Sequence, residues 1–149
     1  MENSNKIKCL LLKTKAEKLS LSKNINSLEK SKDLYLKIIE IAMQNSPFDY
    51  NWIKIAINGI IDQSAYHMLK VAKKLETSKK VENIEKSTTL YHSLLSFVGK
   101  ISDLDDMYND SSNCVILKSI SDECKSGITK SNDLISNITN TQNGDINTK

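Results

Sequence analysis

The chain has 149 residues, which is enough for one compact domain or for two small modules that share a core. Its four glycines and one proline provide few turn signals, so the composition argues against a fold of many short strands. All 21 basic residues are lysines and the net charge is +3, so the arginine forks that bind phosphate and guanine are missing and no nucleic-acid partner is predicted.

The charge is divided unevenly along the chain. Residues 1–100 carry a net charge of +7, whereas residues 101–149 carry −4. The basic part could meet an acidic partner or make a peripheral contact with an anionic membrane surface. The apolar run at residues 9–12 is too short for a signal peptide or a membrane span, so the sequence predicts a cytoplasmic protein.

The sequence offers no pattern for a metal, a cofactor or a disulfide framework. Cys9, Cys114 and Cys124 are an odd number of cysteines without CxxC spacing. Cys114 and Cys124 lie in an apolar-periodic stretch, where most cysteines are small core residues. We therefore expect no metal site and no cofactor.

The apolar spacing predicts the helices in order. A first helix runs from about residue 7 to residue 22, and a second opens with Asn26 and Glu29 as a capping box and ends near Gln44. The Ser46-Pro47-Phe48-Asp49 segment predicts the next helix start, with serine as the cap and proline at the first helical position. From there one long central helix is predicted to about residue 76, with Gly59 as a close helix crossing, a kink or a break.

The C-terminal half predicts two further helices and a tail. A fourth helix is expected over residues 82–102 and an acidic loop over 103–112. A fifth helix follows from residue 115 to about 135, and residues 140–149 are expected to be a disordered tail.

An internal repeat organises these helices. Residues 16–35 and 72–91 share ten identities at an offset of 56 positions, among them the pairs Ser31 and Ser87, and Tyr35 and Tyr91. Self-similarity at a fixed period indicates a duplicated structural unit. The predicted fold is therefore all-α: tandem antiparallel helical hairpins or three-helix modules that share a long central helix, over residues 1–61 and 62–139, in one compact unit.

Residues 28–39 and 84–95 resemble the second helix of the microtubule-interacting and trafficking (MIT) family, with a large residue, a small residue three positions later, and a Leu-Tyr pair. Ala65, Met68, Leu69 and Ala72 resemble the alanine-rich first helix of that family. The shorter Leu-Tyr pattern also suits tetratricopeptide-like hairpins.

The MIT resemblance implies small three-helix bundles, which occur in tandem at the C-terminus of autophagy-initiating kinases and dock a regulatory subunit there. Each module would then bind short helical or extended peptides in grooves beside its second and third helices. The resemblance further implies protein partners in vesicle sorting, membrane remodelling or autophagy, and a location at the periphery of endosomal or autophagic membranes.

The sequence predicts two candidate peptide-binding grooves. In the first, apolar residues of the second helix face the central helix; in the second, residues of the fourth helix face the fifth. Aliphatic residues at this spacing are also typical of core, and only their exposure distinguishes the two. The first groove comprises Leu34, Ile38, Ile41, Ile53 and Ile57, and the second Leu90, Leu94, Phe97, Ile116 and Ile120.

Two other classes of function stay open. The apolar stretch at residues 52–61 could be the interface of a structural subunit that self-assembles, so the oligomeric state is left open. A helical enzyme would have to use His67, His92 or Cys124, but neither histidine has zinc spacing and no nucleophile or phosphate-loop motif is present. No enzyme and no catalytic residue are predicted.

Overall fold

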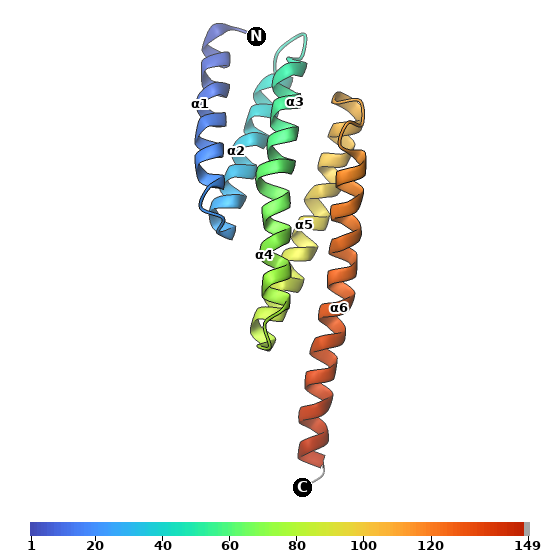
Figure 1. The fold of residues 1–149 in the computed structure, drawn as a ribbon. Coiled ribbons are helices and arrows are strands. Elements are labelled where there is room, and N and C mark those ends of the chain that lie inside the picture. The colour runs from blue at the N-terminus through green and yellow to red at the C-terminus, as the bar shows by residue number, and fades with distance from the viewer. Residues whose placement is uncertain (148–149) are drawn as a thin grey trace.

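The computed structural model describes residues 1–147 and is helical throughout, with short connections and no strand in that range (Figure 1). The predicted all-α fold is confirmed. The α3, η1 and α4 segments follow one another without a break and form the predicted central helix, in which η1 is a π-helical segment. The elements are α1 (Asn3–Ser20), α2 (Ile25–Met43), α3 (Tyr50–Gly59), η1 (Ile60–Ala65), α4 (Tyr66–Glu76), α5 (Val81–Tyr108) and α6 (Cys114–Asn147).

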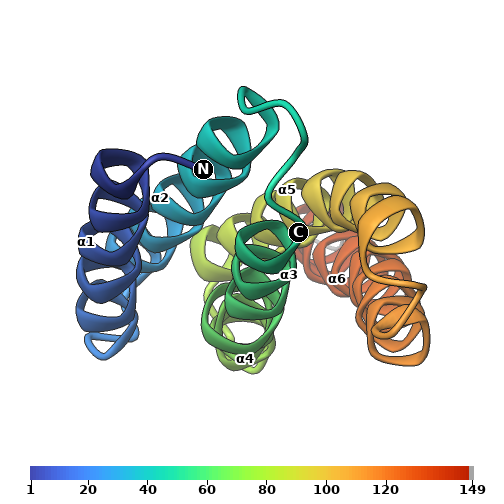
Figure 2. The same ribbon diagram turned by 90° about the horizontal axis from the view of Figure 1, so that it is seen from above.

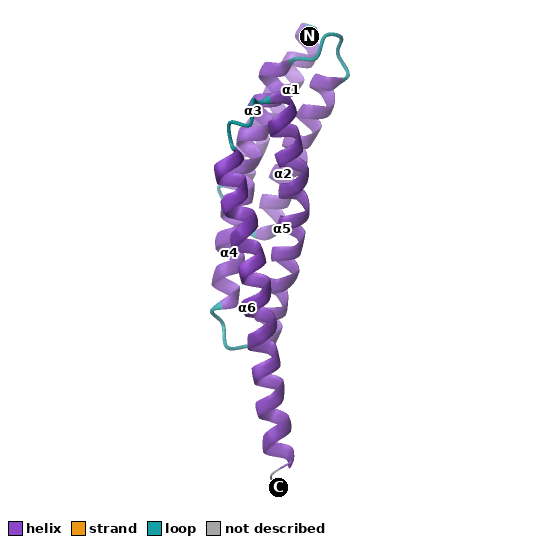
Figure 3. Ribbon diagram, turned by 90° about the vertical axis from the view of Figure 1, so that its right-hand side faces the viewer, coloured by secondary structure: helices purple, strands orange, loops and turns teal. Residues whose placement is uncertain are grey.

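The helices form two layers. Viewed from above, α1, the central helix and α6 lie in one layer, and α2 and α5 cover the spaces between them in the other (Figure 2). Consecutive helices pack against each other, α1 on α2, α2 on α3, α4 on α5 and α5 on α6. The last part of α6 extends beyond the other helices (Figure 3).

Two helix starts differ from the sequence prediction. The cap of α2 is Asn24, whose side chain accepts a hydrogen bond from the Ser27 amide at 2.9 Å, and not Asn26. The cap of α3 is Asp49, which accepts from the Trp52 amide at 3.2 Å, and not Ser46. The Asp49 amide also donates to the Ala42 carbonyl, which holds residues 44–49 outside the helix.

Two segments are more helical than predicted. The α5 helix continues to Tyr108, so much of the expected acidic loop is helix, and Asp105 is fully buried within it. The α6 helix continues to Asn147, past the expected start of the tail at residue 140, and no proline interrupts it. Residues 148–149 of the expected tail lie outside the described residues.

A buried serine joins two helices at each of two places that are 56 positions apart. Ser31 Oγ of α2 donates to the Ala16 carbonyl of α1 at 2.7 Å, and Ser87 Oγ of α5 donates to the Ala72 carbonyl of α4 at 2.8 Å. Both serines are fully buried. The small side chain lets the helices approach closely while its hydroxyl is satisfied by the neighbouring backbone.

A tyrosine lies against a glycine at each of two helix crossings. A Cβ atom on Gly59 would lie 2.5 Å from Cε1 of Tyr35, and one on Gly127 would lie 2.4 Å from Cζ of Tyr91. Of the three interpretations of Gly59, the close helix crossing is therefore the one that the structure shows. The 56-residue offset does not predict the second glycine, because Gly59 follows Tyr35 by 24 residues whereas Gly127 follows Tyr91 by 36.

Candidate functional site

Most of the predicted groove residues belong to the core. Leu34 and Phe97 are half-buried, and Ile116 is 49% exposed. The five residues of the first group form the packed contact between α2 and α3 and not an open groove, because the aliphatic side chains of these two helices bury each other. The buried members of the two groups are Ile38, Ile41, Ile53, Ile57, Leu90, Leu94 and Ile120.

The structure brings Ile116 and Ile120 together in a surface groove between the central helix and α6, which we call the α4–α6 groove. Its volume is about 350 Å³. The α6 residues of the groove are spaced i, i+3, i+4 and i+7, so they share one helix face. The lining residues are Ile61, Asp62, Tyr66, Leu69, Ile116, Ser119, Ile120 and Glu123.

The α4–α6 groove has an apolar floor and two carboxylates at its rim, one of which is paired with a lysine. The side chains of Ile61, Leu69 and Ile120 are almost fully buried, and Ile116 stands above them about half exposed. Asp62 is exposed at the rim, and Glu123 forms an ion pair with Lys73 at 2.5 Å. Such a groove can take up one or two apolar side chains of a partner and favours basic residues beside them.

A larger groove of about 610 Å³ lies where α2 begins beside α5. Leu90 of the second predicted group lines it together with Ile25 and Leu75. Its rim carries three glutamates and one lysine, Lys86, which pairs with Glu82 at 3.3 Å. This surface is more polar than the α4–α6 groove, and only one predicted site residue reaches it.

The two buried tyrosines each donate to a side chain on the central helix. Tyr35 Oη donates to Oε1 of Gln63 in η1, and Tyr91 Oη donates to Oε2 of Glu76 in α4, both at 2.6 Å. Burial, aided by the charge of Glu17, raises the pKa of Tyr35 to about 12. Burial, followed by the hydrogen bond to Glu76, raises the pKa of Tyr91 well above its usual range. Both hydroxyls therefore stay protonated donors at neutral pH and hold the helices in register.

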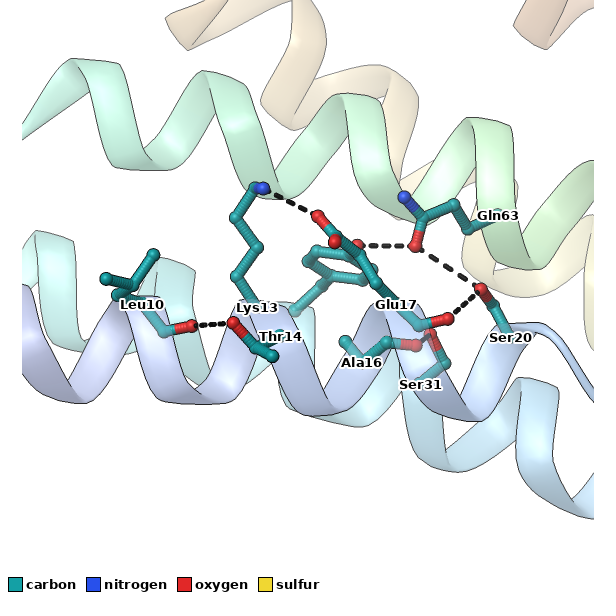
Figure 4. A network of polar contacts seen from close by, with 9 residues as sticks. Leu10, Lys13, Thr14, Ala16, Glu17, Ser20, Ser31 and Gln63 are labelled. Atoms are coloured by element: carbon teal, nitrogen blue, oxygen red, sulfur yellow. Dashed lines mark hydrogen bonds and ion pairs between the residues drawn. The ribbon is translucent and has the colours of Figure 1, made fainter.

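The sequence positions that correspond around the two tyrosines carry long and short side chains in exchanged order. Beside Tyr35, Ser20 Oγ of α1 donates to Oε1 of Gln63 at 3.5 Å; Figure 4 draws this contact. Position 76 is 56 residues after Ser20, and Ser131 follows Gly127 by four residues as Gln63 follows Gly59. Glu76, which accepts the hydrogen bond from Tyr91, thus occupies the position that corresponds to Ser20, and Ser131 of α6 occupies the position that corresponds to Gln63. In the described part of the chain, Ser131 Oγ and Glu76 Oε1 are buried without a hydrogen-bond partner.

The candidate catalytic residues lie on three helices and do not form a reactive group. His67 of α4 is half-buried, with its Nε2 2.9 Å from Lys23 Nζ, and burial and that lysine lower the pKa of the histidine. His92 of α5 is exposed, and burial raises the pKa of the Cys124 thiol to about 11. Within residues 1–147 no three His, Cys, Asp or Glu side chains gather as metal ligands.

The three cysteines differ in accessibility, which corrects one expectation. Cys124 is buried as expected, but Cys114 begins α6 and is exposed.

We therefore expect one fast-reacting thiol, Cys114, when the native protein is treated with Ellman's reagent, because burial keeps Cys9 and Cys124 protonated and covered. Absorbance after mixing should give one equivalent in buffer and three in denaturant, and a Cys114→Ser variant should give none in buffer. A second fast equivalent in buffer would contradict this burial.

The stretch considered as a self-assembly interface is largely covered by its own chain. Its side chains pack against α2 and the rest of the central core, and only Trp52 and Ile55 keep substantial exposure among its large apolar residues. The buried residues of the stretch are Ile53, Ala56, Ile57, Gly59, Ile60 and Ile61.

Comparison of the chain with protein-family models, with curated proteins and with solved structures finds no match.

Proposed function

We propose that this chain is a protein-interaction module that binds a short helical or extended peptide in the α4–α6 groove. The observation that carries the proposal is Ile116, which is 49% exposed above a floor of buried aliphatic side chains. Isolated exposed aliphatic residues are ordinary, but one that lines a concave apolar groove is typical of a recognition site.

The groove favours an amphipathic peptide with basic flanks. A partner helix presents apolar side chains at i, i+3 or i+4, which matches a groove built between two helices. Asp62 at the rim attracts a lysine or arginine of the partner, whereas Glu123 is already paired with Lys73. Rim charges mainly affect the association rate and the choice of partner, and the apolar floor provides most of the affinity.

We further propose that the chain is a duplication of an MIT-like three-helix module. The first copy would comprise α1, α2 and α3, and the second α4, α5 and α6. The serine contacts at an offset of 56 and the two tyrosine–glycine crossings support this view. The α4–α6 groove would then lie between the first and third helices of the second copy, and not beside its second and third helices as the MIT resemblance implies. The partners proposed on this basis act in vesicle sorting, membrane remodelling or autophagy, at the cytoplasmic face of the membranes concerned.

The duplication predicts that a glutamine can accept the hydrogen bond from Tyr91 in the second copy, as Gln63 accepts it from Tyr35 in the first. A Glu76→Ser variant should lose about 1–3 kcal/mol of unfolding free energy, because the buried Tyr91 hydroxyl loses its acceptor. Adding Ser131→Gln should recover at least half of that loss, since Gln63 performs this role beside Tyr35. Urea unfolding of the two single variants and the double variant measures the coupling. Additive losses would mean that the two tyrosine sites are not equivalent.

Peptide selection tests the binding site without a known partner. A displayed library of random peptides is panned on the intact chain, on Ile116→Asp and on Val115→Asp. Val115 is the exposed neighbour of Ile116 and does not line the groove, and both positions lie in the first turn of α6, where a carboxylate suits the helix dipole.

We expect amphipathic peptides with basic residues to bind the intact chain and Val115→Asp alike, and Ile116→Asp at least tenfold more weakly. Peptides that bind all three proteins equally would place the site elsewhere. A library that yields no specific binder would contradict the proposed function.

A further inference from the structure

The outer face of α1 carries a stripe of exposed aliphatic side chains. Ile7, Leu10 and Leu11 are 54 to 66% exposed, and Leu21, directly after the helix, is exposed as well. The spacing i, i+3 and i+4 places the first three on one side of the helix. The opposite side, with Cys9 and Ala16, is buried in the core. The apolar surface of a stripe on an edge helix is removed from water only when another molecule covers it.

The same helix is strongly basic. It contains five lysines and one acidic residue, Glu17, which pairs with Lys13 at 2.6 Å. In the described part of the chain that is the only ion pair of an α1 lysine. Four of the lysines are exposed, so positively charged side chains lie on the same helix as the apolar stripe. These four are Lys6, Lys8, Lys15 and Lys18.

The charge and shape of this face indicate its occupant. A second copy of the chain would bring the lysines of one α1 against those of the other, at a cost in electrostatic repulsion. A peptide would need a concave surface, but the two grooves described above are lined by other elements of the fold. An anionic lipid surface satisfies both properties, because apolar side chains enter the region between headgroups and acyl chains while lysines reach the phosphates.

We propose that α1 binds the surface of anionic phospholipid membranes through Ile7, Leu10 and Leu11 together with its exposed lysines. This contact is peripheral: among the helices within residues 1–147, none has the length and apolar character needed to cross a bilayer. The α1 helix and α6 lie at opposite edges of the molecule (Figure 2), so the α4–α6 groove stays open when α1 faces a membrane. The proposal stands on α1 alone and does not depend on the peptide-binding function.

Vesicle co-sedimentation of the intact chain tests the proposed binding of α1 to anionic membranes. The vesicles are phosphatidylcholine alone, or phosphatidylcholine with phosphatidylserine. One variant removes the apolar stripe, Ile7→Ser with Leu11→Ser, and another reverses charge, Lys8→Glu with Lys15→Glu. The matched controls are on α6: Val115→Ser, and Lys118→Glu with Lys125→Glu, which change exposed residues of the same types. All four substituted proteins alter exposed positions, and thermal melting verifies that each is folded.

We expect the intact chain and both controls to sediment with the phosphatidylserine vesicles and not with phosphatidylcholine alone. A lysine near an anionic surface strengthens binding roughly fivefold, so reversing two of them should weaken it by roughly 25-fold or more. The stripe variant should lose binding to a similar degree.

Three results would overturn the proposal. The first is an intact chain that stays in the supernatant with anionic vesicles. The second is a loss of binding that is as large for the α6 controls as for the α1 variants. The third is a dimer in analytical ultracentrifugation that the stripe variant alone dissociates, since the stripe would then be an interface between two copies.

Discussion

Replacing Gly127 by alanine should destabilise the protein by about 2 kcal/mol, although alanine is the better helix former by about 1 kcal/mol. A Cβ atom at this position would lie 2.4 to 2.8 Å from three atoms of the Tyr91 ring. The ring cannot easily move aside, because it is buried and its hydroxyl is bonded to Glu76. Either α6 must shift away from α5 or the tyrosine must leave its site. Urea unfolding, followed by circular dichroism, measures the loss.

Gly99 provides the matched control for this substitution. It is also inside a helix, α5, but is exposed, and a Cβ atom there would meet nothing within 4 Å. Gly99→Ala should therefore stabilise the protein by about 1 kcal/mol. In a Tyr91→Leu background, Gly127→Ala should lose most of its cost, since the ring atoms are gone. If Gly127→Ala stabilises the protein as much as Gly99→Ala does, α5 and α6 do not cross closely at this glycine.

The second large effect is expected at Asp105, whose carboxylate organises the turn between α5 and α6. It is fully buried and accepts hydrogen bonds from Asn109 Nδ2, from the Asn113 amide and from Asn113 Nδ2, each at 2.9 Å. Oδ1 of Asn58 on α3 also accepts from both asparagine side chains and so joins the turn to the central helix. Asp105→Ala should cost about 2–4 kcal/mol, because it leaves buried donors without a partner.

Asp106 is the control for this prediction. It is the exposed neighbour of Asp105 and accepts one bond, from Ser111 Oγ at 2.7 Å. Asp106→Ala should change the unfolding free energy by less than about 1 kcal/mol. Guanidinium unfolding of both variants gives the comparison, and hydrogen exchange at residues 109–117 should rise only for Asp105→Ala. Equal losses for the two variants would contradict the assigned role of the buried carboxylate.

The helices could be predicted from the sequence because their apolar spacing and turn residues act over short distances. The end of α2 near Gln44 and the unbroken central helix over residues 50–76 follow from such local signals. The helix caps differ from the prediction by two or three residues because several Asn, Asp and Ser side chains compete as caps. The backbone hydrogen bond from Asp49 to Ala42 across the α2–α3 connection favours the start of α3 at Tyr50.

The site was harder to predict because exposure depends on what packs on each helix from the other layer. Leu94 and Ile116 have the same character in the sequence, but Leu94 is fully buried whereas Ile116 is half exposed at a groove. The sequence predicts a loop at Asp105, because only the hydrogen bonds from Asn109 and Asn113 identify it as an aspartate buried within a helix. The close helix crossing at Gly127 could not be predicted, because it depends on Tyr91, which lies 36 residues earlier in the chain.

Site-specific photocrosslinking tests the proposed binding site most directly. A photoreactive phenylalanine analogue is placed at Ile116 in one protein and at Val115 in another, and each is irradiated in cells that express it. The two positions are adjacent in α6, but only Ile116 lines the α4–α6 groove. We predict a discrete crosslinked protein from position 116 that is absent or much weaker from position 115. Equal crosslinking from both positions, or none from either, would contradict recognition of a partner through this groove.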